Sequence, residues 1–120
     1  MNFNQIVLVG RLTSDPEKQV TNSGKEFVRF TLAVNRDYKD DTGSYPTDFI
    51  PCVAFGKLAE FIGQYAQKGR LVLVRGSLET RKAEDKNGSK HTYFTVLLDK
   101  FKFQERQKDN GNNDDDELPI

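Results

Sequence analysis

Apolar residues recur along the chain with two spacings, one typical of strands and one typical of a helix. Five segments rich in β-branched and aromatic residues are predicted to be strands: residues 5–12, 26–34, 48–55, 71–78 and 92–103. Between the third and fourth segments the spacing becomes that of a short helix, with the apolar stripe Leu58, Phe61, Ile62 and Tyr65. Gly69 is expected to end this helix, because glycine is common just past a helix C-terminus.

Glycine and proline residues indicate where the strands turn or bend. Asn22-Ser23-Gly24 predicts a turn after a brief extended stretch, and Lys86-Asn87-Gly88-Ser89 predicts the hairpin between the last two strands. Gly76 predicts a sharp bend in the fourth strand, of the kind that small barrels use. Pro51 lies inside the third strand and indicates an edge position or a bulge there, because proline has no N–H to donate.

The predicted elements follow one another as three strands, a helix and two strands. This is the order of an all-β OB-fold, a five-stranded Greek-key barrel with one helix between strands 3 and 4. We expect residues 1–104 to form this domain. Residues 104–117 contain no apolar side chain, so we expect a flexible linker over 105–113 and a disordered acidic tip over 114–120.

The formal net charge is zero, but the charges are unevenly distributed. All 18 Lys and Arg residues and 13 of the 18 Asp and Glu residues lie within residues 1–108, and five acidic residues follow. A basic body joined to an acidic tail favours a polyanion as the partner of the body and a basic protein as the partner of the tail.

Composition argues against several classes of protein. No apolar run is long enough to span a membrane and no secretory signal opens the chain, so we expect a cytoplasmic protein. Cys52 and His91 are the only residues of their types, too few for a zinc site. Cys52 is predicted to be a small buried hydrophobe, because its apolar strand offers no activating neighbour. We therefore predict no enzymatic activity, no metal and no cofactor.

Aromatic residues are predicted on one surface of the barrel. Phe49 and Phe55 are six residues apart, so they point to one face of a regular strand, and Tyr38 and Tyr45 lie on the polar loop before that strand. Strand aromatics more often pack in a core, and the pattern leaves both alternatives open for the two phenylalanines. Five further phenylalanines in the predicted helix and strands are assigned to the core or to an interface: Phe30, Phe61, Phe94, Phe101 and Phe103.

Basic residues accompany aromatic ones at the predicted hairpin, where Arg81 and Lys82 precede the turn and Tyr93 follows it. Unpaired nucleotides offer a π-face and a phosphate at every position. Cations beside aromatic rings therefore suit them without regard to base sequence. An ordinary solvated surface is the alternative for these cations.

Several ordered motifs carry a more specific signal. They are Asn4-Gln5-Ile6-Val7-Leu8-Val9-Gly10-Arg11-Leu12 with Asp15-Pro16-Glu17, Phe30-Thr31-Leu32-Ala33-Val34, Phe55-Gly56-Lys57-Leu58-Ala59-Glu60, Lys68-Gly69 and Gly76-Ser77-Leu78-Glu79-Thr80-Arg81-Lys82. Together they cover roughly residues 3–103 and resemble the bacterial single-stranded DNA-binding protein (SSB) family in order and spacing. The end of the chain, residues 114–120, resembles the acidic C-terminal tip of that family.

The resemblance implies a homotetramer of OB folds that binds and protects single-stranded DNA in replication, recombination and repair, in the cytoplasm with the nucleoid. It implies base stacking by Tyr38, Phe49 and Phe55 and phosphate contacts by Lys57, Lys68, Arg81 and Lys82. It further implies that the tip recruits replication, recombination and repair proteins; the tip consists of Asp114, Asp115, Asp116, Glu117, Leu118, Pro119 and Ile120.

The chain also departs from the family pattern. It has no tryptophan, whereas the best-studied members stack bases on several; Ala83 stands where tryptophan is common, and Tyr93 is our candidate substitute. Ile50 stands at a tetramer-contact position that is often histidine, and Pro51 stands where a basic residue is common. The tip ends in Pro119-Ile120, whereas the family usually ends in Pro-Phe.

Two classes of function follow from these observations. The first, which we expect, is a strand-coating protein that binds single-stranded DNA without sequence preference and recruits partners through its tip. The second is an oligomeric OB-fold protein-interaction module with weak or vestigial DNA binding, as the missing tryptophans would permit. An OB-fold RNA binder is a third alternative.

Overall fold

The structure is a computed structural model that describes residues 1–104, and this part of the chain contains six strands and one helix. In chain order they are β1 (Ile6–Leu12), β2 (Glu17–Val20), β3 (Glu26–Asn35), β4 (Thr47–Phe55), α1 (Gly56–Tyr65), β5 (Leu71–Glu84) and β6 (Lys90–Phe103). Within residues 1–104, no helix is long and apolar enough to cross a membrane.

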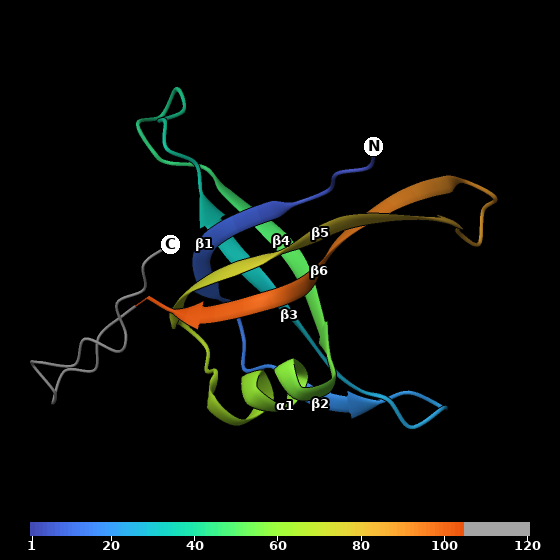
Figure 1. The fold of residues 1–120 in the computed structure, drawn as a ribbon. Helices are drawn as coiled ribbons and strands as arrows, with labels where there is room; N and C mark the ends of the chain where they lie inside the picture. Colours follow the sequence, from blue (N-terminus) through green and yellow to red (C-terminus); the bar gives the residue numbers. More distant parts are fainter. Residues whose placement is uncertain (105–120) are drawn as a thin grey trace, which may run out of the picture.

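Five of the strands close into a barrel (Figure 1). The sheet order is β1-β5-β6-β4-β3-β2, and β1 also pairs with β3 at Arg11 and Leu12. β4 and β6 pair in parallel at Cys52 and Val53, and the other pairings are antiparallel. With α1 between the third and fourth barrel strands, this arrangement confirms the predicted OB-fold. The short β2 is an addition that pairs with β3 outside the barrel.

Two glycines allow neighbouring strands to approach closely. A Cβ atom at Gly10 would collide with the carbonyl oxygen of Ala33 on β3, where β1 completes the barrel. A Cβ atom at Gly76 would collide with the carbonyl oxygen of Leu97 on β6. The β5–β6 register shifts between Arg75 and Gly76, at the position where the sequence predicts a bend.

The register shift changes which residues of β6 face the core. Before it Val96 and Leu98 are buried, and after it Phe101 is buried. Asp99 is the extra residue between them, and its carboxylate accepts a 2.8 Å hydrogen bond from Nε of Arg75 at the surface. With a strict two-residue alternation, Phe101 would point outwards when Val96 and Leu98 point into the core.

Side chains from the five barrel strands and from α1 fill the core. The buried residues include Leu12, Val28, Phe30, Leu32, Cys52, Ala54, Ala59, Ile62, Val72, Val74, Val96 and Phe101. The prediction that Cys52 is a buried hydrophobe is confirmed. Burial raises the pKa of its thiol to about 12, so the nucleophilic thiolate does not form at neutral pH.

Helix α1 lies against one end of the barrel (Figure 1). Ala59 and Ile62 are buried, and Leu58 is partly buried against the core. Phe61 and Tyr65, the other half of the predicted stripe, are 39% and 52% exposed and lie at the margin of the packed face.

The prediction that Gly69 ends the helix is wrong. The helix ends at Tyr65, and Ala66 is already extended although its N–H still donates to the carbonyl of Ile62. Gly69 lies in the next turn with φ of +88°, a conformation that favours glycine, and its N–H donates a 2.9 Å hydrogen bond to the carbonyl of Leu12.

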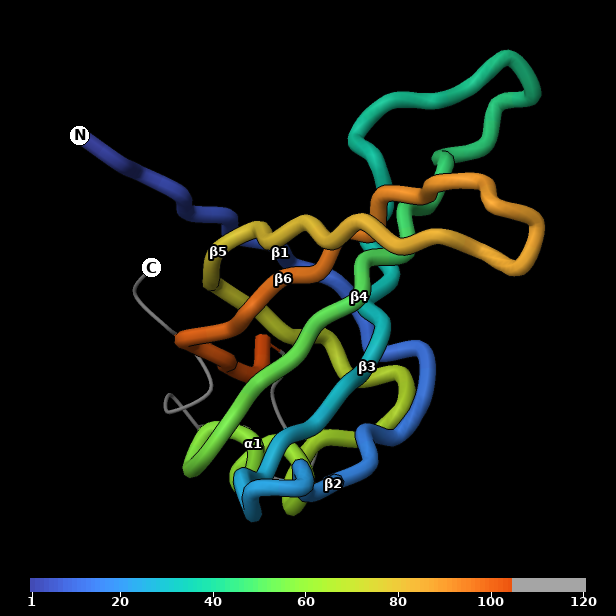
Figure 2. Tube along the Cα trace, turned by 90° about the vertical axis from the view of Figure 1, so that its right-hand side faces the viewer, coloured from blue at the N-terminus to red at the C-terminus, as the bar shows by residue number. Residues whose placement is uncertain are grey.

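Two segments project beyond the barrel on the side away from α1 (Figure 2). They are the β3–β4 loop, residues 36–46, and the outer half of the β5–β6 hairpin. The predicted hairpin turn is confirmed, because the N–H of Asp85 donates to the carbonyl of Ser89 at 2.9 Å.

Pro51 causes no bulge in β4. The β3–β4 register is unbroken along the whole of β4, with Pro51 opposite Thr31. On the other side of β4, the pairing with β6 begins at Cys52. Pro51 therefore lies where the described part of β4 has a paired strand on one side only, as the edge alternative predicts.

Candidate nucleic-acid interface

The unbroken β3–β4 register places aromatic and basic side chains on one outer face. Phe49 and Phe55 lie on the same face of β4, as their spacing predicts, because they are an even number of residues apart. Opposite Phe55 on β3 is Phe27, with ring centroids 5.9 Å apart, and two residues further Arg29 lies opposite Val53.

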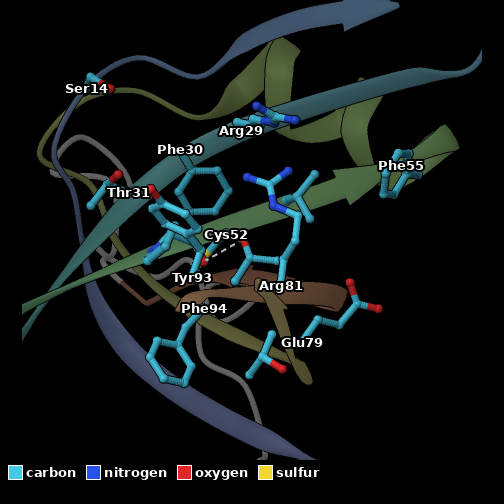
Figure 3. Close-up of a pocket in the computed structure, with 14 residues that line it drawn as sticks. Ser14, Arg29, Phe30, Thr31, Cys52, Phe55, Glu79, Arg81, Tyr93 and Phe94 are labelled. Atoms are coloured by element: carbon cyan, nitrogen blue, oxygen red, sulfur yellow. Dashed lines mark hydrogen bonds between the residues drawn. The ribbon is translucent and has the colours of Figure 1, made fainter. Parts of the chain in front are cut away.

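A groove of about 620 Å³ runs between this face and the β5–β6 hairpin (Figure 3). Its lining residues include the aromatic residues Phe55, Tyr93 and Phe94 and the basic residues Arg29 and Arg81. Arg81 pairs with Tyr93 across the hairpin. The two arginines therefore enter the groove from different strands, β3 and β5, with rings around them.

More basic than acidic side chains line the groove. Arg29 and Arg81 are its basic lining residues and Glu79 is its acidic one. Within residues 1–104, neither arginine forms an ion pair with a carboxylate. Both guanidinium groups are therefore available to an anion such as a phosphate.

Three of the proposed stacking rings each have a cation beside them. Lys25 Nζ lies 4.5 Å from the Phe55 ring centroid, and the Arg81 guanidinium lies 5.7 Å from the Tyr93 centroid. The ring of Tyr38 has Arg36 at 5.9 Å. A cation beside an aromatic ring pairs a stacking surface with a positive charge at the same place, which is the combination that an unpaired nucleotide requires.

The structure brings together only part of the set predicted from sequence. Phe55, Arg81 and Tyr93 line the groove. Phe49 and Tyr38 do not line it, although both are strongly exposed, at 64% and 56%. They lie at the start of β4 and on the β3–β4 loop, beyond the groove.

The predicted lysines lie outside the groove. Lys57 is an exposed residue in the first turn of α1, and Lys68 is exposed in the turn after it, with its backbone N–H donating to Asp15 Oδ1 at 2.7 Å. Lys82 is exposed on β5 opposite Thr92. The predicted tip, 114–120, lies outside the described residues.

Phe94 does not belong to the core, so of the two alternatives predicted for it, core or interface, the core is wrong. Its side chain is 55% exposed and lines the groove. Phe94 shares the alternation of the buried Val96 and Leu98, but it lies outside the β4–β6 pairing, which begins at Val96. The exposure of Phe94 depends on where the hairpin separates from the barrel, which its own sequence does not reveal.

Arg29 is a groove residue that the sequence reasoning missed. It alternates between the buried Val28 and Phe30 on β3, so its side chain had to point outwards. Its pairing with Val53 on the Phe55 face was not visible without the β3–β4 register.

The arrangement is suited to binding rather than to catalysis. The one cysteine is buried with its thiol protonated at neutral pH. In residues 1–104, no three His, Cys, Asp or Glu side chains come together as a metal site. What the groove offers is exposed rings with basic groups beside them.

Comparisons with known proteins find a family match over most of the chain. The model of the single-strand binding protein family matches residues 3–104. The single-stranded DNA-binding protein of Caldanaerobacter subterraneus subsp. tengcongensis is 45% identical over 103 residues, which are 86% of this chain and 69% of the relative. That of Fusobacterium nucleatum subsp. nucleatum is 45% identical over 111 residues, 91% of this chain and 71% of the relative. Single-stranded DNA-binding protein 1 of Staphylococcus aureus is 41% identical over 113 residues, which are 94% of this chain and 72% of the relative.

Proposed function

The chain belongs to the single-strand binding protein family, and we propose that it binds single-stranded DNA without sequence preference through the groove and the rings beside it. Membership confirms the resemblance carried by the sequence motifs. Proteins of this family are non-enzymatic DNA-binding proteins, and we assign no catalytic activity to this chain.

The observation that carries the proposal is that two arginines, which form no ion pair with a carboxylate within residues 1–104, line one groove together with aromatic rings. Arg29 and Arg81 offer planar donors to phosphate, and Phe55, Tyr93 and Phe94 offer ring surfaces to bases. Every base has a π-face and every nucleotide a phosphate, so these contacts require no particular sequence.

Residues outside the groove extend the proposed path of the DNA. Phe49 and Tyr38 are exposed rings beyond one end, and Lys82 follows Arg81 along the hairpin. Lys57 lies in α1 and Lys68 in the turn after it, so their contribution requires the DNA to continue past the groove to the helix. These assignments rest on the exposure of the side chains and on the family motifs.

A fluorescence-anisotropy titration with labelled oligo-dT tests the proposal. We expect tight binding whose affinity falls with salt, with a slope of about 0.7 in log Kobs against log salt for each phosphate contact. Binding in the micromolar range or weaker that ignores salt would favour the protein-interaction module instead. Tighter binding of poly-rU than of poly-dT would favour the RNA-binding alternative.

The stacking assignments have their own test. The double substitution Tyr38→Ala with Phe55→Ala is expected to weaken oligo-dT binding while the barrel stays folded, because two stacking surfaces are lost. An unchanged Kd for the folded double variant would refute these two positions.

We propose a homotetramer, with β1 as one contact surface. Residues 6–10 of β1 pair with β5 on one side, whereas the pairing with β3 on the other begins at Arg11. Val7 and Val9 on this half-paired strand are 48% and 44% exposed. An open strand edge beside apolar side chains supports pairing with a second copy. Light scattering is expected to give four chains, and a monomer would contradict the assembly.

The remaining proposals concern the organisation of the chain. We propose an OB-fold domain over 1–104, a linker over 105–113 and a tip over 114–120 that binds replication, recombination and repair proteins in the cytoplasm. Four consecutive carboxylates followed by Leu118, Pro119 and Ile120 support a partner pocket that is both basic and apolar. Deleting 114–120 should abolish pull-down of such partners and leave oligo-dT affinity intact or higher; loss of DNA binding would contradict this division.

A further inference from the structure

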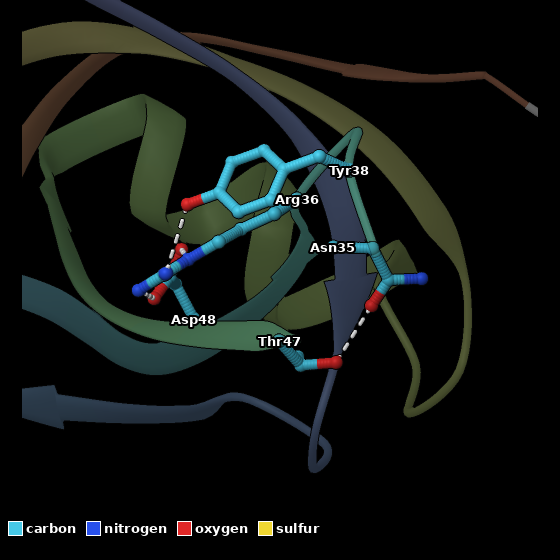
Figure 4. A network of polar contacts seen from close by, with 5 residues as sticks. All are labelled: Asn35, Arg36, Tyr38, Thr47 and Asp48. Atoms are coloured by element: carbon cyan, nitrogen blue, oxygen red, sulfur yellow. Dashed lines mark hydrogen bonds and ion pairs between the residues drawn. The ribbon is translucent and has the colours of Figure 1, made fainter. Parts of the chain in front are cut away.

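The β3–β4 loop is fastened where it leaves and re-enters the sheet. The backbone N–H of Arg36 donates a 2.8 Å hydrogen bond to the carbonyl of Pro46. Beside it, Thr47 Oγ1 donates to Asn35 Oδ1 at 2.7 Å (Figure 4). The two ends of the loop are thus held together by backbone and side-chain contacts.

Arg36 extends this fastening into the loop. Its Nε and Nη2 donate to the two carboxylate oxygens of Asp48, each at 3.0 Å, and its Nη1 donates to the Tyr38 hydroxyl at 3.0 Å (Figure 4). One planar guanidinium therefore joins β4 to the ring that the loop carries. The hydrogen bond from Arg36 lowers the pKa of Asp48, so the carboxylate remains ionised at neutral pH.

The side chain of Tyr38 makes its contacts with Arg36. Within residues 1–104, the hydrogen bond and the ring–cation contact of the Tyr38 side chain are both made with Arg36. The ring is 56% exposed, with no place in the core cluster. The tip of the loop is closed separately, by Asp40 Oδ1 accepting from the backbone N–H groups of Thr42 and Ser44.

We propose that the Arg36–Asp48 pair is a positioning device that holds the Tyr38 ring ready to stack on a base. The proposal rests on the proposed function, since it requires DNA to reach Tyr38. A ring on an unfastened loop loses rotational freedom when a base binds it, whereas a ring already held loses little. Asp48 then contributes to affinity without touching the nucleic acid.

The direction in which one substitution changes the affinity for DNA separates this role from a simple effect of charge. Asp48→Asn removes a negative charge, which by charge alone makes the protein more attractive to phosphates. If the pair positions Tyr38, the same substitution weakens DNA binding, because the Arg36 guanidinium loses its bidentate carboxylate partner. Asp41→Asn is the matched control: it makes the same charge change in the adjoining β3–β4 loop, at an exposed residue outside the network.

The experiment is a double-mutant cycle read by oligo-dT titration. Asp48→Asn is expected to weaken binding by about two- to tenfold, the range for ordering one side chain. Asp41→Asn is expected to leave affinity unchanged or slightly higher. In a Tyr38→Ala background Asp48→Asn is expected to have no weakening effect, because the ring it positions is gone.

Two further variants keep the test available if Asp48→Asn does not fold, as judged by its thermal transition. Arg36→Lys keeps the charge but not the bidentate fork, and Tyr38→Phe keeps the ring but not the hydroxyl. Both should weaken binding, and the Arg36→Lys effect should also disappear in the Tyr38→Ala background.

The outcomes distinguish the two levels of the proposal. If Tyr38→Ala weakens binding and Asp48→Asn weakens it by the same factor with or without Tyr38, the positioning role is overturned and the stacking role of Tyr38 stands. Tighter binding by Asp48→Asn also overturns the positioning role. If Tyr38→Ala has no effect, both the positioning role and the assignment of Tyr38 to the DNA path fail.

Discussion

Two groups of aromatic residues in this molecule have different neighbours. In the helix-end cluster, Phe61, Tyr65, Phe101 and Phe103, the rings contact one another, with centroids between 5.1 and 6.4 Å apart. In the groove, Phe55 and Tyr93 lie beside the cations Lys25 and Arg81, and Phe94 is exposed. One group is packed together, and the other is spread along a basic surface.

The comparison shows that the neighbours and exposure of a ring decide whether it stabilises the fold or offers surface to a base. Phe101 is 5% exposed and fills space, and its edge-to-face contacts stabilise the fold. Tyr93 is 48% exposed with a guanidinium beside it, so its ring has accessible surface for a base. The helix-end cluster also has a cation, Arg70, at 4.2 Å from the Phe103 centroid, which supplies matched controls.

The largest expected effect concerns stability. Phe101→Ala should lower the free energy of unfolding by about 3–5 kcal/mol, because it opens a cavity among packed rings. Urea unfolding measures this loss. At temperatures where the variant is folded, oligo-dT affinity should be unchanged. A loss of affinity in the folded variant would contradict the separation of the two groups.

The next effect concerns affinity and compares two tyrosines of similar exposure. Tyr93→Ala should weaken oligo-dT binding by about 1–3 kcal/mol, the value of one stacked base. Tyr65→Ala, at a ring 52% exposed in the helix-end cluster, should leave the Kd nearly unchanged. Equal losses from both variants would mean that exposure alone, and not the groove, decides which rings bind.

The smallest effect concerns the salt dependence of DNA affinity and compares two arginines. Arg29→Ala should lower the slope of log Kobs against log salt by about 0.7, which corresponds to about fivefold in affinity at 0.1 M salt. Arg70→Ala should leave that slope unchanged, since its guanidinium lies in the helix-end cluster, beside Phe103, and not in the groove. A titration series over several salt concentrations measures both; a slope that responds to Arg70 and not to Arg29 would contradict the assignment.

Local patterns were enough to predict the strand order, the helix and the hairpin. The even spacing of Phe49 and Phe55 gave their shared face, because alternation is a property of the strand itself. The turn at Asn87-Gly88 was predicted for the same reason, since its backbone conformation is decided by adjacent residues.

The features that could not be predicted from the sequence depend on contacts between strands that are distant along the chain. The sequence predicted a bend at Gly76 but not the register shift beside it, which leaves Asp99 without a partner residue on β5. The choice between core and interface for Phe94 could not be made from sequence, because Phe94 lies just before the β4–β6 pairing that begins at Val96. Arg29 was missed because its place beside Phe55 follows from the β3–β4 register. In each case the residue type was compatible with more than one environment.

Photochemical crosslinking of oligo-dT to the full-length protein, with mass spectrometry of the crosslinked peptides, asks directly which rings touch the bases. Crosslinks should map to Phe55, Tyr93 and Phe94 in the groove and to the exposed rings beyond it. Crosslinks confined to Phe61, Tyr65 and Phe103 would contradict the account, because they would place the DNA on the packed cluster instead of the basic groove.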